Sequence, residues 1–208
     1  MKISVAKSAG FCFGVKRAIK TALDTVSQGN PVEMLGDIVH NEDVVRQIEA
    51  AGIRKVNHLS SGQGKILLIR AHGAARKITA SARDLGYTIV DATCPMVKEI
   101  HTIVQDREAQ GSSIIIIGDR DHEEVEGIKG QLCSEALVID NVENIPHDRI
   151  ASIDRAAVVV QSTQNLERVL SIVEVLKGHI QELEFYNTIC KATTTRQNEI
   201  KTMPLGND

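Results

Sequence analysis

The sequence of 208 residues predicts an α/β protein with parallel sheets, and two patterns lead to this prediction. Short apolar runs such as Ile66–Ile69 and Ile114–Ile117 contain no polar residue, which is typical of parallel strands covered on both faces. Amphipathic helical segments separate these runs, and strand–helix alternation of this kind predicts an α/β fold. The predicted strands are Lys2–Ala6, Val32–Leu35, Ile66–Ile69, Tyr87–Asp91, Ile114–Ile117, Ala136–Ile139, Ala157–Val160 and Leu183–Tyr186.

Two of the segments between strands carry an apolar stripe at helical spacing, which predicts helices that pack one face on a sheet. A third helix is predicted at the end of the chain, over residues 192–203. The two stripes consist of Val15, Ala18, Ile19, Ala22, Leu23 and Val26, and of Leu166, Val169, Leu170, Val173 and Leu176.

Three cysteines recur about 80 to 100 residues apart, each predicted to follow a strand and to open a helix. This spacing suits small α/β lobes, so we expect a first lobe over 1–94 and a second over 95–190. Residues 191–208 add one helix, which cannot build a lobe, and are therefore expected to be the remnant of a missing third lobe.

The composition excludes several classes of protein. A formal net charge of −3 and 2% aromatic residues give no support for nucleic-acid binding, so any bound anion must be held by local groups. The first residues lack the features of a signal peptide, and no run is long enough to span a bilayer. We therefore expect a cytoplasmic protein, in which disulfides are rare.

The cysteines are the strongest sign of a metal centre. Cys12, Cys94 and Cys190 each stand where a helix begins, and the positive potential there favours the thiolate that binds metal. A single cysteine is most often a small buried residue, but three in equivalent positions favour a shared role. Their spacing alone does not distinguish an iron–sulfur cluster from zinc. Cys133 lies outside such a turn and is predicted to be structural.

Polar side chains suited to an anion also follow the predicted strands. His40, His72 and His122 stand in these turns, where imidazole donors and exposed N–H groups could hold a diphosphate, and Asn41 could cap the next helix. Glu124 is the best-placed carboxylate for proton transfer, although an acid in a first helical turn is common. Ser162 and Thr163 offer hydroxyls at another strand end, where such residues often only cap helices.

Seven segments of the chain, taken in order, resemble the signature segments of the LytB/IspH family. The resemblance spans the whole chain, and the combination of motifs is specific. The segments are AGFCFGVKRA (9–18), IVHN (38–41), RAHG (70–73), VDATCPMV (90–97), HEEVEG (122–127), QST (161–163) and NTICKATTTRQ (187–197).

The resemblance implies small parallel-sheet lobes around a 4Fe–4S cluster held by Cys12, Cys94 and Cys190. Three thiolates leave one iron open for the allylic hydroxyl of 4-hydroxy-3-methylbut-2-enyl diphosphate. Two electrons from ferredoxin or flavodoxin then release water, giving isopentenyl and dimethylallyl diphosphate in the non-mevalonate isoprenoid pathway.

The resemblance also implies roles for the polar residues. Glu124 would be the proton source, with Ser162 as a relay. His40, His72, His122, Ser162 and Thr163 would bind the substrate.

The chain departs from the family pattern in two places. Family members typically have Gln-Thr-Thr where this chain has Gln161-Ser162-Thr163, which keeps the hydroxyl but removes a methyl group that restricts it. Family members also continue into a third lobe, which supplies further contacts to the diphosphate. Two alternatives therefore stand beside the reductase: an inactive truncated fragment of it, and a zinc-dependent hydrolase that uses the same cysteines.

Overall fold

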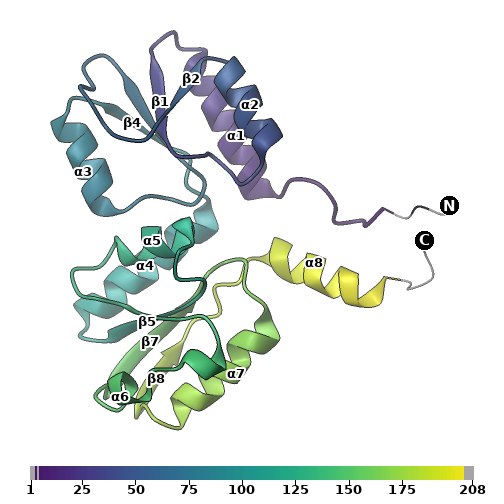
Figure 1. Cartoon of the computed structure of the whole chain (residues 1–208), viewed down its shortest axis with the longest axis vertical. Helices are drawn as coiled ribbons and strands as arrows, with labels where there is room; N and C mark the ends of the chain where they lie inside the picture. The colour runs from purple at the N-terminus through teal and green to yellow at the C-terminus, as the bar shows by residue number, and fades with distance from the viewer. Residues whose placement is uncertain (1–2, 4, 204–208) are drawn as a thin grey trace. The chain divides into compact units, whose positions relative to one another are not determined.

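The computed structural model describes residue 3 and residues 5–203, and the chain forms two compact units, each with one parallel sheet (Figure 1). The amino-terminal unit comprises Phe13–Gln105 and Asp121–Glu135. The carboxy-terminal unit comprises Met1–Cys12, Asp106–Arg120 and Ala136–Asp208. Each unit is thus completed by a segment that is distant in the sequence.

The sheet of the amino-terminal unit has four parallel strands in the order β2-β1-β3-β4. Its central strand β3 is buried along its whole length, as its apolar run predicted. The pairing places Val32 opposite Ile66, and Ile66 opposite Thr88. The strands are β1 (Val32–Leu35), β2 (Ile53–Val56), β3 (Ile66–Ile69) and β4 (Thr88–Asp91).

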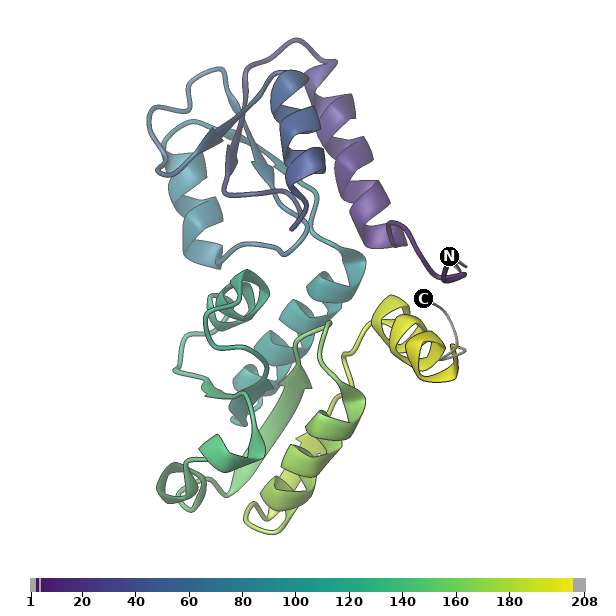
Figure 2. The same ribbon diagram turned by 45° about the vertical axis from the view of Figure 1, so that its right-hand side comes forward.

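Helices cover both faces of this sheet. α1 and α2 lie on one face and α3 on the other (Figure 1; Figure 2). The first face buries Ala18, Met34 and Ile48 completely, and the second buries Leu67 and Ala82. The helices of this unit are α1 (Phe13–Val26), α2 (Glu42–Ala50), α3 (Arg76–Asp84), the first part of α4 (Pro95–Ala109) and α5 (Glu123–Lys129).

The sheet of the carboxy-terminal unit has the order β6-β5-β7-β8 and is also parallel throughout. Both faces of its central strands are buried: Ile114, Ile115, Ile116 and Ile117 are each at most 1% exposed. The elements are β5 (Ser113–Ile117), β6 (Leu137–Ile139), the 3₁₀ turn η1 (Val142–Asn144), α6 (His147–Ile150), β7 (Arg155–Val160), α7 (Leu166–Lys177), β8 (Glu182–Phe185) and α8 (Lys191–Thr202).

The predicted α/β class with parallel sheets is confirmed, but the structure corrects some details. β2 was not predicted, because its sequence places Arg54 and Lys55 between two apolar residues, as an edge strand tolerates. Two predicted stripe residues, Leu23 and Leu170, are 36% and 48% exposed, since each lies at the rim of its buried stripe.

The predicted strand Lys2–Ala6 is wrong for its described residues. Lys2 and Ser4 lie outside the described residues, and Ile3, Val5 and Ala6 belong to no strand. Cys12 therefore does not follow a strand in the described part of the chain, although it directly precedes α1.

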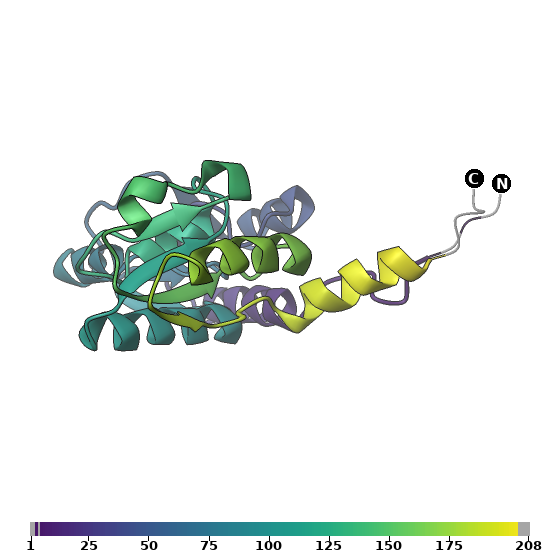
Figure 3. The ribbon, with the colours of Figure 1, turned by 90° about the horizontal axis from the view of Figure 1, so that it is seen from below.

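The segment before Cys12 is held instead by side chains of α8, beside which it lies (Figure 3). The carboxylate of Glu199 accepts hydrogen bonds from the backbone N–H of Lys7 and, at 2.8 Å, from that of Ser8. Arg196, three residues earlier on α8, donates to the carbonyl oxygens of Ser8 and Gly10. These bonds satisfy backbone groups that a strand ladder would otherwise pair.

This arrangement predicts that Glu199→Gln will loosen the segment before Cys12. An amide side chain has one acceptor oxygen in place of two and no charge, so it cannot accept from both N–H groups equally well. We expect faster amide hydrogen exchange at Lys7 and Ser8. Glu167→Gln is the matched control, because it removes a carboxylate that pairs with Lys201 of α8. Equal exchange in both variants would contradict the role of Glu199.

Candidate active site

Three polar loops of the amino-terminal unit lie at the same edge of its sheet. Because β1, β3 and β4 are parallel, their carboxyl ends lie at one edge, and His40, His72 and Cys94 follow these three ends. The loop after β1 ends at Asn41, whose side chain accepts the N–H of Val44 at 3.0 Å and caps α2. The predicted cap is therefore confirmed, and it fixes the backbone directly after His40.

The structure brings together the three histidines that were predicted to bind the substrate. The rings of His40 and His72 are stacked, with their centroids 4.2 Å apart. His122 stands edge-on to both, at 5.2 Å from His40 and 5.9 Å from His72. Three imidazoles at this separation can all contact one diphosphate.

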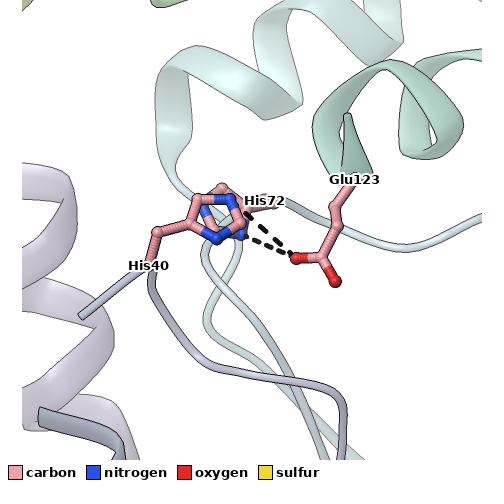
Figure 4. Close-up of side chains that lie close together, drawn as sticks. All are labelled: His40, His72 and Glu123. Carbon is pink, nitrogen blue, oxygen red and sulfur yellow. Dashed lines mark ion pairs between the residues drawn. The ribbon is translucent and has the colours of Figure 1, made fainter. Parts of the chain in front are cut away.

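A carboxylate that the sequence analysis did not single out lies beside these rings. Glu123 Oε2 is 3.6 Å from His72 Nδ1 and 4.0 Å from His40 Nε2 (Figure 4). Its other oxygen, Oε1, forms an ion pair with Arg70. Glu123 therefore connects the RAHG motif, which contains Arg70 and His72, to the HEEVEG motif.

A glycine makes room for this ion pair. Gly36, at the end of β1, has φ +77°, and a Cβ atom there would lie 2.5 Å from the guanidinium Nη1 of Arg70. A side chain at this position would therefore be strained and would also displace Arg70. The backbone of the β1 loop is thus shaped around Arg70 and Glu123.

The electrostatic state of His72 follows from its burial. Desolvation, together with the neighbouring His40, Arg70 and His122, lowers the pKa of His72 to about 3. The ring is therefore neutral near pH 7. Its Nδ1 atom and Glu123 Oε2 are both buried, and neither has a hydrogen-bond partner among the described residues.

His122 caps α5 and has one defined tautomer when it is neutral. Its Nδ1 accepts the backbone N–H of Glu124 at 3.0 Å, so the proton of the neutral ring is on Nε2. That N–H is available to an anion. Glu124 follows in the first turn of α5 and is only 2% exposed.

The loop that carries Cys94 is tightly fixed. Asp91, at the end of β4, accepts from the N–H of Thr93 at 2.9 Å, and Arg17 donates to the carbonyl of Thr93 at 3.0 Å. The N–H of Cys94 donates to the carbonyl of Ala71 at 2.9 Å, which joins this loop to the one that carries His72. Cys94 itself is a half-buried cysteine that directly precedes α4.

Asp91 also stabilises the loop through its charge. Burial by itself would raise the pKa of Asp91, but hydrogen bonds from Lys98 and Thr93 outweigh it and lower the pKa. The carboxylate therefore stays ionised at neutral pH and holds both groups.

The carboxy-terminal unit contains the remaining predicted residues. Ser162 is buried in the turn after β7, and its carbonyl oxygen accepts the N–H of Cys190 at 2.9 Å. Thr163 is exposed and accepts a hydrogen bond from the side-chain amide of Gln161. Gln161 is 1% exposed and also accepts the N–H of Asp119, which fixes the turn.

α8 contacts several of the segments of the carboxy-terminal unit that carry predicted site residues. Cys190 caps the helix, with its Sγ accepting the N–H of Thr193 at 3.4 Å. Gln197 donates to the carbonyl of Gln164 at 3.1 Å, next to the turn that carries Ser162. Since Arg196 and Glu199 hold the segment before Cys12, one helix positions the backbone around Cys12, Cys190 and Ser162.

The predicted site residues thus form two groups, each within one unit. The amino-terminal unit holds His40, His72, His122, Glu124 and Cys94. The carboxy-terminal unit holds Cys12, Ser162, Thr163 and Cys190.

A cation could also be held at the histidine cluster. One ligand atom each from His40, His72 and Glu123 lie within 4.8 Å of one another, as a metal site requires. However, Arg70 already neutralises Glu123 and would stand beside any bound cation. This geometry favours an anionic ligand over a metal ion.

Several of these contacts were not predicted from the sequence. Arg17, on α1, donates to the Thr93 carbonyl and so holds the Cys94 loop. Cys133, which was predicted to be structural, is exposed. Arg70 and Glu123 were missed although they stand beside predicted histidines. Only one sign of their pairing was present in the sequence, which is that they carry opposite charges within the RAHG and HEEVEG motifs.

The fold and these loops define an α/β protein with half-buried thiols and clustered imidazoles at the ends of parallel strands. The model of the family described as LytB protein matches residues 3–206 of the chain. The chain belongs to the LytB family.

Individual relatives agree with this assignment. The 4-hydroxy-3-methylbut-2-enyl diphosphate reductase of Clostridioides difficile (strain 630) is 40% identical over 203 residues, covering 97% of this chain and 73% of that protein.

Two solved structures are also similar. One, of (E)-4-hydroxy-3-methyl-but-2-enyl diphosphate reductase, the terminal enzyme of the non-mevalonate pathway, is 33% identical with a TM-score of 0.84, covering 96% of this chain and 72% of that one. The reductase from Plasmodium falciparum is 30% identical with a TM-score of 0.81, covering 91% and 61%. These comparisons support a reductase over a zinc-dependent hydrolase.

No helix within residues 5–203 combines the length and the apolar character needed to cross a lipid bilayer.

The buried histidines predict that acid destabilises the amino-terminal unit. Burial lowers the pKa of His72 to about 3 and that of His101 to about 4, whereas both return to about 6.5 on unfolding. The unfolded state therefore binds more protons below pH 6.5. The free energy of unfolding should fall as pH drops from 6.5 to 5, by at most about 1.4 kcal/mol per pH unit for each histidine.

Urea unfolding at several pH values measures this slope. His101→Gln removes one of the two histidines, so the free energy of unfolding should fall less steeply between pH 6.5 and 5. His179→Gln is the control, because His179 is exposed. The explanation fails if both variants keep the wild-type slope.

Proposed function

We propose that this chain carries out the reductive dehydroxylation of 4-hydroxy-3-methylbut-2-enyl diphosphate to isopentenyl and dimethylallyl diphosphate, in the non-mevalonate isoprenoid pathway. The observation that carries the proposal is the cluster of His40, His72 and His122 beside the Cys94 loop, in a member of a family of reductases. The reaction consumes two electrons and two protons and releases water.

We propose Cys12, Cys94 and Cys190 as the ligands of a 4Fe–4S cluster. Each of the three is a half-buried cysteine that directly precedes a helix. Half-burial leaves the sulfur accessible to a metal, and the helix N-terminus favours the thiolate. The donor set therefore fits such a cluster, which when bound supplies electrons to the substrate one at a time.

The three histidines would bind the diphosphate. His122 presents its Nε2–H, because its Nδ1 already accepts the N–H of Glu124. The ring centroids of His40 and His72 lie 5.2 Å and 5.9 Å from that of His122, so all three rings can contact the same phosphates. Local imidazole donors explain how a chain of net charge −3 could bind a highly charged anion.

The proton-transfer groups would be Glu124 and Ser162. Glu124 is nearly fully buried, so its carboxyl group is shielded from bulk water. Ser162 is also buried, in a turn that Gln161 fixes. We propose that Glu124 supplies the proton, that Ser162 relays it, and that Thr163 contributes a hydroxyl to substrate binding.

The electron donor in this proposal is ferredoxin or flavodoxin, and the location is the cytoplasm, where free thiols are typical. The chain spans 73% of the length of the Clostridioides difficile relative.

The first test is the metal content after anaerobic reconstitution. We expect about four iron and four sulfide ions per chain, falling in a Cys190→Ser variant because one thiolate is lost. Cys133→Ser is the control, since Cys133 is exposed and is not a proposed ligand. A parent chain that binds no stable cluster would contradict the proposed cluster site.

Turnover by the reconstituted chain tests the role of Glu124. Glu124→Gln keeps the shape of the side chain but cannot donate a carboxyl proton, so kcat should fall by about 10²- to 10⁴-fold. Iron content should stay unchanged. Glu126→Gln, on the same helix and ion-paired with Lys129, should keep wild-type kcat. Wild-type kcat in Glu124→Gln would exclude it as the proton source.

A further inference from the structure

The cluster of histidines contains a carboxylate that an anion site would not be expected to hold. Glu123 is the first residue of α5, directly after the cap residue His122. Its side chain is about one-third exposed, and its Oε2 atom is buried against His72 and His40. A negative charge at this position would by itself repel a diphosphate.

Arg70 is the group that electrostatics alone would place on a diphosphate. Its guanidinium pairs instead with Glu123 Oε1, on the side of the carboxylate away from the two imidazoles. Gly36 leaves the space that this guanidinium occupies. The loop after β1, the loop after β3 and the start of α5 all contribute to this arrangement, so it depends on three separate motifs.

The second oxygen of Glu123 and the nitrogen of His72 that it faces both lack a hydrogen-bond partner within the described part of the chain. His72 Nδ1 and Glu123 Oε2 are 3.6 Å apart and buried, which is just beyond hydrogen-bond distance. A small rotation of either side chain would close the gap and pair both atoms. An imidazole whose Nδ1–H is bound to a carboxylate is fixed in orientation, as the histidines of metal sites are.

We propose that Glu123 is a positioning residue for diphosphate binding: held by Arg70, its carboxylate aligns His72 and His40 so that both rings direct an N–H group at the ligand. This inference rests on the proposed function. An imidazole that donates one N–H to Glu123 and another to the diphosphate carries two protons. Binding of the anion is therefore accompanied by proton uptake at His72, and Glu123 stabilises the cationic His72 ring.

The surroundings of His72 are consistent with proton uptake only when an anion binds. In the free protein, burial together with His40, Arg70 and His122 keeps the His72 ring neutral, although the Glu123 carboxylate lies 3.6 Å from its Nδ1. A bound diphosphate would reverse this balance by adding negative charge on the side opposite Glu123.

The test compares two substitutions with the same change of charge on one helix. Inorganic pyrophosphate is titrated into the reconstituted holoenzyme by calorimetry, in buffers of different ionisation enthalpy. Glu126→Gln removes a carboxylate that pairs with Lys129, and it should leave affinity and proton uptake unchanged. Glu123→Gln should weaken binding about tenfold, as loss of a histidine-orienting partner does, and should reduce proton uptake.

Whether Glu123→Gln weakens or tightens pyrophosphate binding distinguishes a positioning role from simple repulsion. If Glu123 merely repelled the anion, removing its charge would tighten binding, and that result overturns the inference. Affinity equal to that of Glu126→Gln also overturns it, while wild-type binding of pyrophosphate would leave the proposed function intact. If the wild-type protein itself binds no pyrophosphate, the proposed diphosphate site and this inference both fail.

Two further measurements separate positioning from a structural role. Glu123→Gln should raise KM for the substrate with kcat unchanged, because binding is lost equally in the ground state and the transition state. Arg70→Gln should weaken pyrophosphate binding similarly, and the double variant Arg70→Gln/Glu123→Gln should be no weaker than either single variant. Additive losses would contradict a shared action through the imidazoles.

Discussion

Parallel strand pairing is the constraint on which both groups of site residues depend. In a parallel sheet all carboxyl ends lie at one edge. Residues from motifs that are far apart in the sequence are therefore brought close together. His40, His72 and Cys94 follow three strands of one sheet for this reason. In the other sheet, Ser162 follows β7 and Cys190 follows β8, and a backbone hydrogen bond joins them.

The loops at these strand ends are held by polar side chains, because loops cannot rely on ladder hydrogen bonds. Asp91 and Arg17 fix the Cys94 loop, Gln161 fixes the Ser162 turn, and Arg196 with Glu199 fixes the segment before Cys12. Each such bond satisfies a backbone group that would otherwise be unpaired. Two of the site residues also cap helices themselves: His122 caps α5 and Cys190 caps α8.

The fold could be predicted from the sequence wherever a local pattern was sufficient. The strands β3 and β5 were predicted because burial on both faces requires an unbroken apolar run. The helix α7 was predicted because burial of one face requires apolar residues at helical spacing. β2 could not be identified, since an edge strand with Arg54 and Lys55 resembles a loop. The segment before Cys12 has the alternation of a strand, yet α8 binds its backbone through side chains 180 residues and more away in the sequence.

The sequence by itself determined the α/β class, the positions of the cysteines and histidines in turns, and the family. These depend on residue type and order, which are local. Only the tertiary structure decided that Glu123 pairs with Arg70 and faces two imidazoles, that His72 is buried enough to be neutral, and that α8 holds the segment before Cys12. Distances between charged groups and the desolvation of a ring arise from packing between distant segments, and no local pattern encodes them.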